Sequence, residues 1–443
     1  MKFFILFTTL LVGVLGANIS NISIANNPAA RLICYYDSSS FSREGLGKLT
    51  TTDLEPALQF CSHMVYGYAG LHNDNSKLIS LNQNLDLDAG KGHFRTITNF
   101  KKKYPHLKIL LGVGGGRDEN PEKYLSMLEA SVNRMAFINS AHALVKTYNF
   151  DGIDLGWQFP PNKPKKIRGS IGKFWKGFKK IFSGDSVLDE KAEEHKEEFT
   201  ALVRELKNAF RPEGFSVSLT VLPNVNSSIF IDVNAIVNYL DFVTLAAFDF
   251  QTPTRNPKEA DFPAPLYELN ERNPEHNVNY QVQYWLNGHC PATKINVGIA
   301  AYGRAWKMSS DSGITGVPPI PETEGEAPAG LSSLTPGFLS WPEVCSKLPN
   351  PSNSHLKGAD APLRRVGDPT KRFGTYAYRI PDDNGEHGMW VGYEDADTAG
   401  NKASYVRAKG LGGIALFDLS HDDFGGRCTG DRYPLLRAAK ARL

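Results

Sequence analysis

The nine residues from Phe150 to Gln158 combine carboxylates with the pattern of a buried strand. They read F-D-G-I-D-L-G-W-Q, and their apolar side chains recur at every second position, which is the period of a β-strand. Asp151 and Asp154 are costly to bury unless they are paired or hydrogen-bonded. In barrel enzymes, polar groups at the end of a strand carry out the chemistry. The stretch therefore indicates a functional site, and the alternative is a plain barrel strand with capping aspartates.

This stretch resembles the signature of glycoside hydrolase family 18, the chitinases, which runs D-G-x-D-x-D-W-E. Four positions match that signature: Asp151, Gly152, Asp154 and Trp157. Two positions differ. Gly156 stands where the family has its third aspartate, and Gln158 stands where it has the glutamate that protonates the glycosidic oxygen. The motif is therefore degenerate, and the resemblance implies a protein without catalytic residues.

The change at Gln158 removes the proton donor of the reaction. In such chitinases the acid protonates the leaving oxygen while the N-acetyl oxygen of the substrate attacks the anomeric carbon. A glutamine amide cannot deliver a proton, and a general acid typically contributes ~10²–10⁴-fold. Gly156 also lacks the carboxylate that would steady the positive charge on the cyclised N-acetyl group. A residual hydrolase would need another acid, and Asp154 lies roughly 13 Å deeper along the strand, too far to serve.

Composition and charge exclude several other classes of protein. The chain has 443 residues, which is long enough for one large core or two domains, and its net charge of +2 creates no field that would favour nucleic acid. Residues 1–17 carry one lysine before a short apolar run and predict a secretory signal peptide that is too short to span a membrane. We therefore expect a secreted, extracellular and soluble protein. Three N-x-S sequons begin at Asn18, Asn21 and Asn226, and Asn226 is the main expected glycosylation site.

Because secreted proteins meet an oxidising environment, the five cysteines are candidates for disulfide bonds. Cys34 lies in one predicted strand and Cys61 immediately precedes the next, so the two could join neighbouring strands of the barrel. Cys345 and Cys428 are the remaining distant pair. Cys290 is then expected to be a free thiol, buried or in a loop, and the alternative for it is intermolecular pairing.

Eight strand-like segments separated by helical spacers predict an α/β protein, a (β/α)₈ TIM barrel with its site at the carboxyl ends of the strands. The segments are residues 31–37, 62–69, 106–116, 150–158, 215–222, 241–250, 295–306 and 412–419. Residues 128–148 predict one of the helices, with a stripe formed by Leu128, Val132, Met135, Ile138 and Val145. The segment of residues 307–393 is too long for one helix and contains short aromatic runs. It therefore predicts a small α+β insertion domain between strands seven and eight. The barrel would then span residues 30–306 and 394–443.

The resemblance to family 18 extends from Cys34 to Phe424 and implies a carbohydrate cleft. Its candidate binding residues are Tyr35, Trp157, Gln158, Phe248, Asp249, Tyr302, Arg304 and Phe417. Sugar rings stack on aromatic faces, yet Ser39, Gly116 and Phe417 stand where the family has tryptophan, and Phe248 replaces a tyrosine. Together these losses imply weaker binding of chitin. Each phenylalanine taken singly could instead be an apolar side chain that packs inside the barrel.

One branch of the family, the insect chitinase-like imaginal disc growth factors, combines these features. Its members carry glutamine at the catalytic position, a long insert after strand four, and the run C-Y-Y-D-S-S-S, which extends here from Cys34 to Ser40. The resemblance implies a growth factor that promotes cell proliferation, supports cuticle and extracellular matrix organisation, and acts through an unidentified cell-surface receptor. The alternative is a lectin that binds chitin-type oligosaccharides without hydrolysis. The resemblance to this branch implies no cofactor and no metal, and a monomer is expected.

The segment after strand four, residues 160–184, holds eight lysines or arginines and no acidic residue. Apolar residues from Ile171 to Phe182 fall at helical spacing, so the segment predicts a basic amphipathic helix beside the mouth of the site. One interpretation is a helix docked on the barrel with a solvated polar face. The other is a surface that binds sulfated glycans or acidic receptor faces.

Changing Lys173, Lys176, Lys179 and Lys180 to glutamate is expected to lower the salt concentration at which the protein elutes from heparin. Exposed charges are screened strongly, because the Debye length is ~8 Å at physiological ionic strength. The measurement compares the native and quadruple variant chains on one salt gradient. If both elute at the same salt concentration, the insert does not bind sulfated glycans.

Overall fold

The computed structural model of this chain describes residues 30–161 and 189–443. The predicted signal peptide, the sequons at Asn18 and Asn21, and residues 162–184 of the basic insert lie outside the described residues. Within the two described ranges, no helix is both long enough and apolar enough to cross a membrane.

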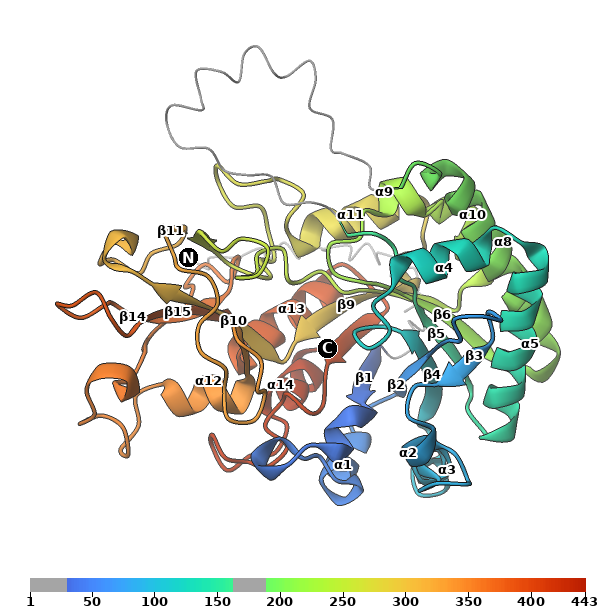
Figure 1. The fold of residues 1–443 in the computed structure, drawn as a ribbon, viewed down its shortest axis with the longest axis horizontal. Coiled ribbons are helices and arrows are strands. Elements are labelled where there is room, and N and C mark those ends of the chain that lie inside the picture. The colour runs from blue at the N-terminus through green and yellow to red at the C-terminus, as the bar shows by residue number, and fades with distance from the viewer. Residues whose placement is uncertain (1–29, 162–188) are drawn as a thin grey trace, which may run out of the picture.

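Eight parallel strands form a closed barrel, which confirms the fold predicted from the sequence (Figure 1). Closure is complete because β1 pairs with β2 on one side and with β16 on the other. The barrel strands are β1 (Arg31–Asp37), β2 (His63–Leu71), β4 (Lys108–Gly114), β5 (Gly152–Gly156), β6 (Ser216–Val221), β7 (Phe242–Leu245), β9 (Ile295–Ala300) and β16 (Gly413–Phe417). The short strand β3 (Leu78–Ser80) pairs antiparallel with the end of β2.

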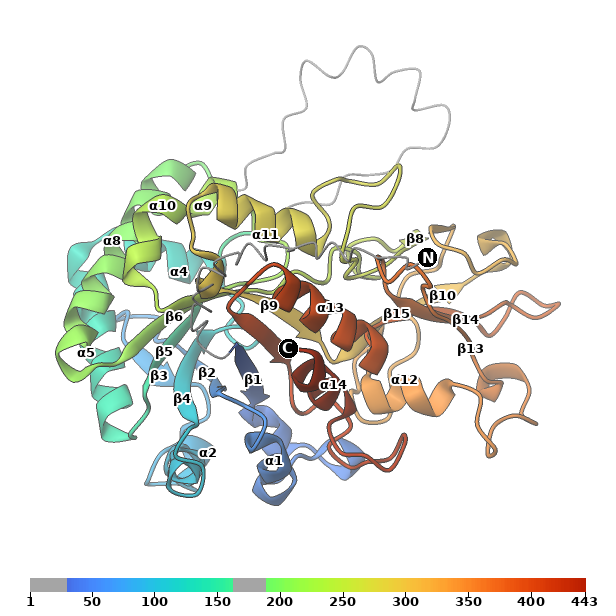
Figure 2. The ribbon, with the colours of Figure 1, turned by 180° about the vertical axis from the view of Figure 1, so that it is seen from behind.

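Helices surround the barrel and cover the outward faces of its strands (Figures 1 and 2). They are α1 (Thr51–Leu58), α2 (Gln83–Asp86), α3 (His93–Thr98), α4 (Pro121–Leu128), α5 (Ser131–Thr147), α8 (Ala192–Phe210), α9 (Ser227–Phe230), α10 (Val233–Ile236), α11 (Val278–Asn287), α13 (Ala396–Ala408) and α14 (Pro434–Arg442). The outward-facing side chains and these helices form the main hydrophobic core. A smaller apolar cluster, which includes Tyr35 and Phe242, fills the inside of the barrel.

The helix predicted over residues 128–148 is wrong in its extent and partly wrong in its buried face. The structure has two helices there, because α4 ends at Leu128 and α5 begins at Ser131. Val132 and Met135, expected in the buried stripe, are 71% and 51% exposed. Leu128, Ile138 and Val145 are buried as predicted, and Phe137 and Ala141 join the last two on the buried face of α5.

The single strand expected over residues 295–306 is also wrong, because the chain divides there into two strands of different sheets. β9 ends at Ala300 in the barrel, and β10 (Tyr302–Met308) begins a second, antiparallel sheet. The order of that sheet is β12 (Phe338–Ser340), β10, β15 (Gly388–Tyr393), β14 (Thr375–Arg379) and β13 (Arg364–Val366). The smaller unit, at the left of Figure 1, therefore takes its first strand from residues before 307.

Further short elements accompany the second sheet. The helix α12 (Trp341–Lys347) follows β12 directly, and β8 (Glu259–Ala260) pairs with β11 (Ile320–Pro321) as a separate two-stranded sheet. The second sheet has its own apolar cluster around Trp306, Trp390, Tyr376 and Tyr378. This separate cluster supports the wall that the second sheet forms beside the barrel mouth.

Candidate functional site

The strand β5 presents Asp154 to the inside of the barrel, where three side chains hold its carboxylate. Ser218 Oγ donates to Oδ1 over 2.6 Å, while Thr220 Oγ1 and Tyr35 OH donate to Oδ2 over 2.7 and 3.1 Å. Asp154 is 1% exposed, and burial raises its pKa although these hydrogen bonds oppose that rise. The carboxylate is thus bound to neighbours from β1 and β6, and its position is fixed by them.

Gln158 lies at the carboxyl end of the same strand, with its amide turned toward the main chain. Its Nε2 donates to Gly115 O over 2.5 Å and to Gly156 O over 3.4 Å. The residue is only 6% exposed. Both donors of the amide are therefore engaged by the glycine-rich end of β4 and by β5 itself, and the side chain has no proton to give to a leaving group.

Gly156 occupies a position at which the neighbouring backbone leaves no room for a side chain. A Cβ atom there would lie 2.8 Å from Val113 O and 3.0 Å from Gly115 N. The two segments are joined at this point, because Gly115 N donates to Gly156 O over 3.1 Å. A carboxylate at position 156 would require the end of β4 to move.

The Gly156→Ala variant is expected to lose about 1–3 kcal/mol of unfolding free energy, which is the usual cost of overpacking a closed site. The measurement is urea unfolding followed by far-UV circular dichroism. Gly116→Ala is the matched control, because nothing lies within 4 Å of a Cβ at that nearby glycine. Equal unfolding midpoints for the two variants would contradict the steric account of Gly156.

A second polar group joins the barrel to the second sheet at the cleft. Arg304 donates from Nε and Nη2 to the two carboxylate oxygens of Asp249 over 2.7 and 2.6 Å, and Tyr302 OH adds a bond of 2.8 Å to Oδ2. Burial acts to lower the pKa of Arg304, but the charge of Asp249 outweighs it and raises that pKa. Asp249 also has a left-handed φ of 58°, which is uncommon outside glycine.

Aromatic rings line the wall between these two polar groups. Tyr35 and Phe417 stack with centroids 3.9 Å apart, and Phe248 meets Phe417 edge-on at 5.2 Å. Tyr302 continues the row, with its centroid 6.1 Å from that of Phe248. A cavity beside this row is lined by Phe248, Asp249, Tyr302 and Arg304, together with residues of the second sheet. The structure therefore brings most of the predicted carbohydrate-binding residues to one side of the barrel mouth.

Trp157 was predicted to bind carbohydrate, and the structure contradicts this. The residue is 1% exposed and its ring packs against Tyr124, Phe137 and Phe199, with centroids 4.9–5.8 Å apart. Alternation along β5 sends Trp157 outward to the helices when Gln158 turns inward. A residue buried between the barrel and its helices cannot contact a ligand in the cleft.

Asp151 also lies away from the cleft, at the amino end of β5. Its Oδ2 accepts a hydrogen bond from Ile109 N over 2.8 Å and forms an ion pair with Lys101 Nζ at 3.0 Å. These contacts join β5 to β4 at the bottom of the barrel. Asp151 matches the family signature, but its role is to hold two strands together and not to take part in chemistry at the cleft.

Sequence reasoning missed a charged cluster at the cleft rim, close to two positions where family tryptophans are absent. Arg117 donates from Nε to Asp37 Oδ2 over 3.0 Å and also donates to Asp37 and Ser39 from Nη2. Arg43 adds a contact of 3.3 Å to the same carboxylate. The available signal was that Asp37 ends one strand and Arg117 follows the glycines of another strand in the same barrel.

Tyr68, in the carboxyl half of β2, is a further residue that sequence reasoning missed. A Cβ atom at Gly115 would lie 2.2 Å from the Tyr68 ring, so the tyrosine can pack here only because residue 115 is a glycine. Burial raises the pKa of Tyr68, and the nearby Asp37, Asp418 and Asp154 raise it further. The hydroxyl is therefore a neutral group facing several acids.

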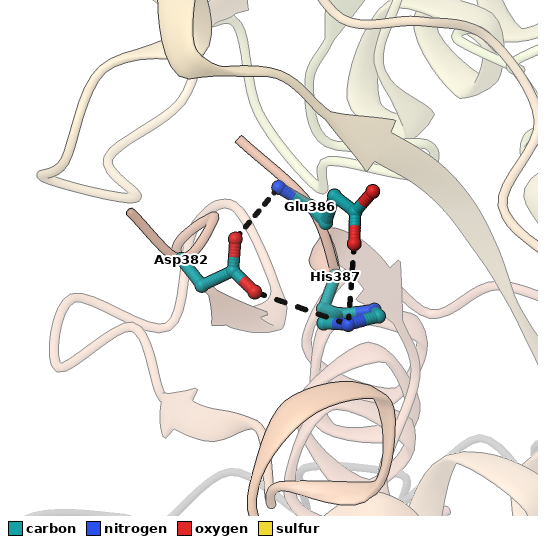
Figure 3. A group of neighbouring side chains, drawn as sticks. All are labelled: Asp382, Glu386 and His387. Carbon is teal, nitrogen blue, oxygen red and sulfur yellow. Dashed lines mark hydrogen bonds and ion pairs between the residues drawn. The ribbon is translucent and has the colours of Figure 1, made fainter. Parts of the chain in front are cut away.

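Among the described residues, one group has a spacing that could suit a metal ion, namely Asp382, Glu386 and His387 (Figure 3). Their ligand atoms lie within 4.8 Å of one another, but all three residues are exposed. Asp382 Oδ1 accepts hydrogen bonds from the main-chain nitrogens of Asn384 and Glu386, at 3.0 and 2.9 Å. These bonds stabilise the turn between β14 and β15.

The structure joins Cys34 to Cys61 and Cys345 to Cys428, and it leaves Cys290 as a buried free thiol. The first disulfide joins β1 to the segment just before β2, and the second ties α12 to the loop after β16. Asn226, the described sequon, caps α9 through its Oδ1, which accepts from Ser228 N over 3.0 Å. That bond leaves Nδ2, the atom that would carry a glycan, available.

The closed barrel, the inserted sheet and the strand-end site define a protein of the glycosyl hydrolase class. The profile described as "Glycosyl hydrolases family 18" matches residues 31–422. The chain belongs to this family, within its group of insect chitinase-like imaginal disc growth factors.

Several relatives support this placement. The "Chitinase-like protein Idgf4" of Glossina morsitans morsitans is 67% identical over 98% of this chain and 99% of its own length. "Imaginal disk growth factor 6" of Drosophila melanogaster is 60% identical over 96% of each chain. The catalytic domain 2 of the Ostrinia furnacalis group II chitinase superposes with a TM-score of 0.76 at 28% identity, over 94% of this chain and 96% of that one. Human YKL-39, described as a pseudo-chitinase with retained chitooligosaccharide binding, gives 0.72 at 26% identity, covering 94% and 99%.

Proposed function

We propose that this protein is a secreted growth factor on a chitinase scaffold that has lost hydrolysis. It promotes cell proliferation and supports cuticle and extracellular matrix organisation, and it acts through a cell-surface receptor. The main support for the loss of hydrolysis is Gln158, which stands where the family has its catalytic glutamate. Its amide donates to the carbonyls of Gly115 and Gly156. The names of the imaginal disc growth factor relatives support the signalling role.

The test is the addition of purified protein to cultured cells of insect imaginal discs, with cell number as the readout. We expect a dose-dependent increase that persists in the Asp154→Asn variant, since no catalytic step is involved. Heat-denatured protein is the control for contaminating growth-promoting factors. A mitogenic response that disappears with Asp154→Asn, in a variant that still folds, would indicate an enzymatic mechanism instead.

A second candidate function is chitooligosaccharide binding without hydrolysis, and the aromatic row favours it. Phe417, Phe248 and Tyr302 lie beside the cavity at Asp249 and Arg304, so a sugar face could stack there while its hydroxyls meet charged groups. YKL-39, which shares the fold, is described as keeping such binding.

Titration with chitotetraose, followed by calorimetry, tests the lectin function. Binding that is lost with Tyr302→Ala and absent for cellotetraose, which lacks N-acetyl groups, would support it. Heats at the level of dilution for both sugars would exclude it and leave the growth-factor proposal standing.

A further inference from the structure

A second cavity lies between the second sheet and α13, behind the wall that faces the barrel mouth. It shares Phe373, Gly374, Thr375 and Glu394 with the cavity beside Asp249, so these residues separate the two hollows. Glu394 directly follows β15 and precedes α13, and Figure 2 shows α13 beside β15. The cavity takes no part in the degenerate catalytic motif, because none of its lining residues belongs to β5.

The inner wall of this cavity contains a buried acceptor that lacks a partner. Glu394 is 4% exposed, and its Oε1 accepts a hydrogen bond from Lys402 Nζ. Lys402 also donates to Ala264 O over 2.9 Å. Glu394 Oε2 has no hydrogen-bond partner within the described part of the chain. Leaving a buried carboxylate oxygen unbonded is costly, so the site favours a ligand that brings a donor.

The acids at the rim of the cavity are already engaged. Asp368 accepts hydrogen bonds from the main-chain nitrogens of Thr370, Arg372 and Phe373 over 2.7–2.8 Å. Asp397 lies 3.5 Å from Arg365. Both carboxylates keep their charge, which these donors partly offset.

Two cations at the rim are left without an acidic partner. Arg372 lies over the ring of Tyr267, with Cζ 4.8 Å from the ring centroid, and in residues 30–161 and 189–443 it forms no ion pair. Lys371, which precedes it and also lines the cavity, forms none in those ranges either. A guanidinium and an ammonium of this kind favour an anionic group on the ligand.

We propose that this cavity binds a polyhydroxylated anion, namely a sugar acid or a sulfated sugar. A ligand hydroxyl donates to Glu394 Oε2, while the carboxylate or sulfate of the ligand meets Arg372 and Lys371. The apolar side chains of Leu266 and Phe373, which also line the cavity, contact the sugar ring. A neutral sugar would leave the cations unpaired, and a simple anion would leave Glu394 Oε2 without a donor, so the ligand needs both properties.

Calorimetric titration of the full chain with glucuronate, glucose and acetate tests both requirements. We expect glucuronate to bind at least tenfold more tightly than glucose, which lacks the anion, and than acetate, which lacks the hydroxyls. Glucose 6-sulfate should bind comparably, because sulfate replaces the carboxylate. Undetectable binding of glucuronate at millimolar concentration, or equal affinity for all three, would overturn the proposal.

Variants then locate the site on the molecule. Arg372→Gln should weaken glucuronate binding at least fivefold, because it removes a charge-assisted contact at the exposed rim. Arg211→Gln, at the end of α8 and outside the cavity lining, is the matched control and should bind as the native chain does. Glu394→Gln should also lose binding, but it disturbs the ion pair with Lys402, so Arg372→Gln provides the decisive result. If Arg372→Gln retains native affinity, the anion is bound elsewhere, for example by the basic segment, and the proposal fails.

Discussion

The Gln158→Glu variant and the native protein are both expected to hydrolyse chitooligosaccharide no faster than the uncatalysed background. A general acid typically contributes ~10²–10⁴-fold, so restoring it would appear at first to rescue the enzyme. However, the carbonyls of Gly115 and Gly156 face this side chain and would repel a carboxylate. The third aspartate of the family motif is absent as well, and Gly156 has no room for a Cβ atom. Adding Gly156→Asp to the variant should therefore also fail.

The measurement is release of sugar from chitotetraose, with the catalytic domain 2 of the Ostrinia furnacalis group II chitinase as the active reference. Gln158→Met, a residue of similar size without the amide, is the matched control for binding effects. Recovery of the reference rate by Gln158→Glu alone would show that the rest of the site is intact. Native turnover that Asp154→Ala abolishes would show that the protein is still a hydrolase.

Arg304→Ala is expected to destabilise the fold by about 3–5 kcal/mol, which is the usual cost of removing one partner from a buried ion pair. Asp249 is 6% exposed and would lose the two bonds from Arg304, while the hydroxyl of Tyr302 would still donate to it. The loss should be large because Asp249 is held in a left-handed backbone conformation at the junction of the barrel and the second sheet. The measurement is the free energy of unfolding from urea titration.

Two further variants isolate the buried charge as the cause. Arg437→Ala breaks an exposed ion pair with Asp431 and should cost no more than about 1 kcal/mol. The double variant Arg304→Leu/Asp249→Asn should be more stable than Arg304→Ala, because no charge remains buried without a partner. If Arg304→Ala costs as little as Arg437→Ala, the pair is not the structural junction described above.

The sequence predicted the barrel well because its strands have strong local patterns. The run from Arg31 to Asp37 is strand β1 without any change of boundary, and the other seven strands lie inside their predicted segments or extend only slightly beyond them. The disulfide pairs of the structure are also those expected from the positions of the cysteines. The strand patterns depend on neighbouring residues, and the disulfide pairs follow from the order of the predicted strands along the chain.

The orientation of side chains was harder to predict. Along β5 both faces are buried, so alternation separates Asp154 from Trp157 without showing which one faces the barrel interior. The division at Ala301 was hard to predict because a single residue separates the end of β9 from the start of β10. The contact between Arg117 and Asp37 joins residues 80 apart in sequence, and only the closed barrel brings them together.

The disulfide between Cys345 and Cys428 has a consequence for how the molecule responds to proteases. Its two cysteines are 83 residues apart, and Lys357, in an exposed loop, lies between them. A trypsin-like cut after Lys357 would sever the backbone, but both fragments would remain covalently joined. The nicked chain would therefore run as one band on a non-reducing gel and as two after reduction. Breaking the last covalent link between the two fragments would require a reductant as well as a protease.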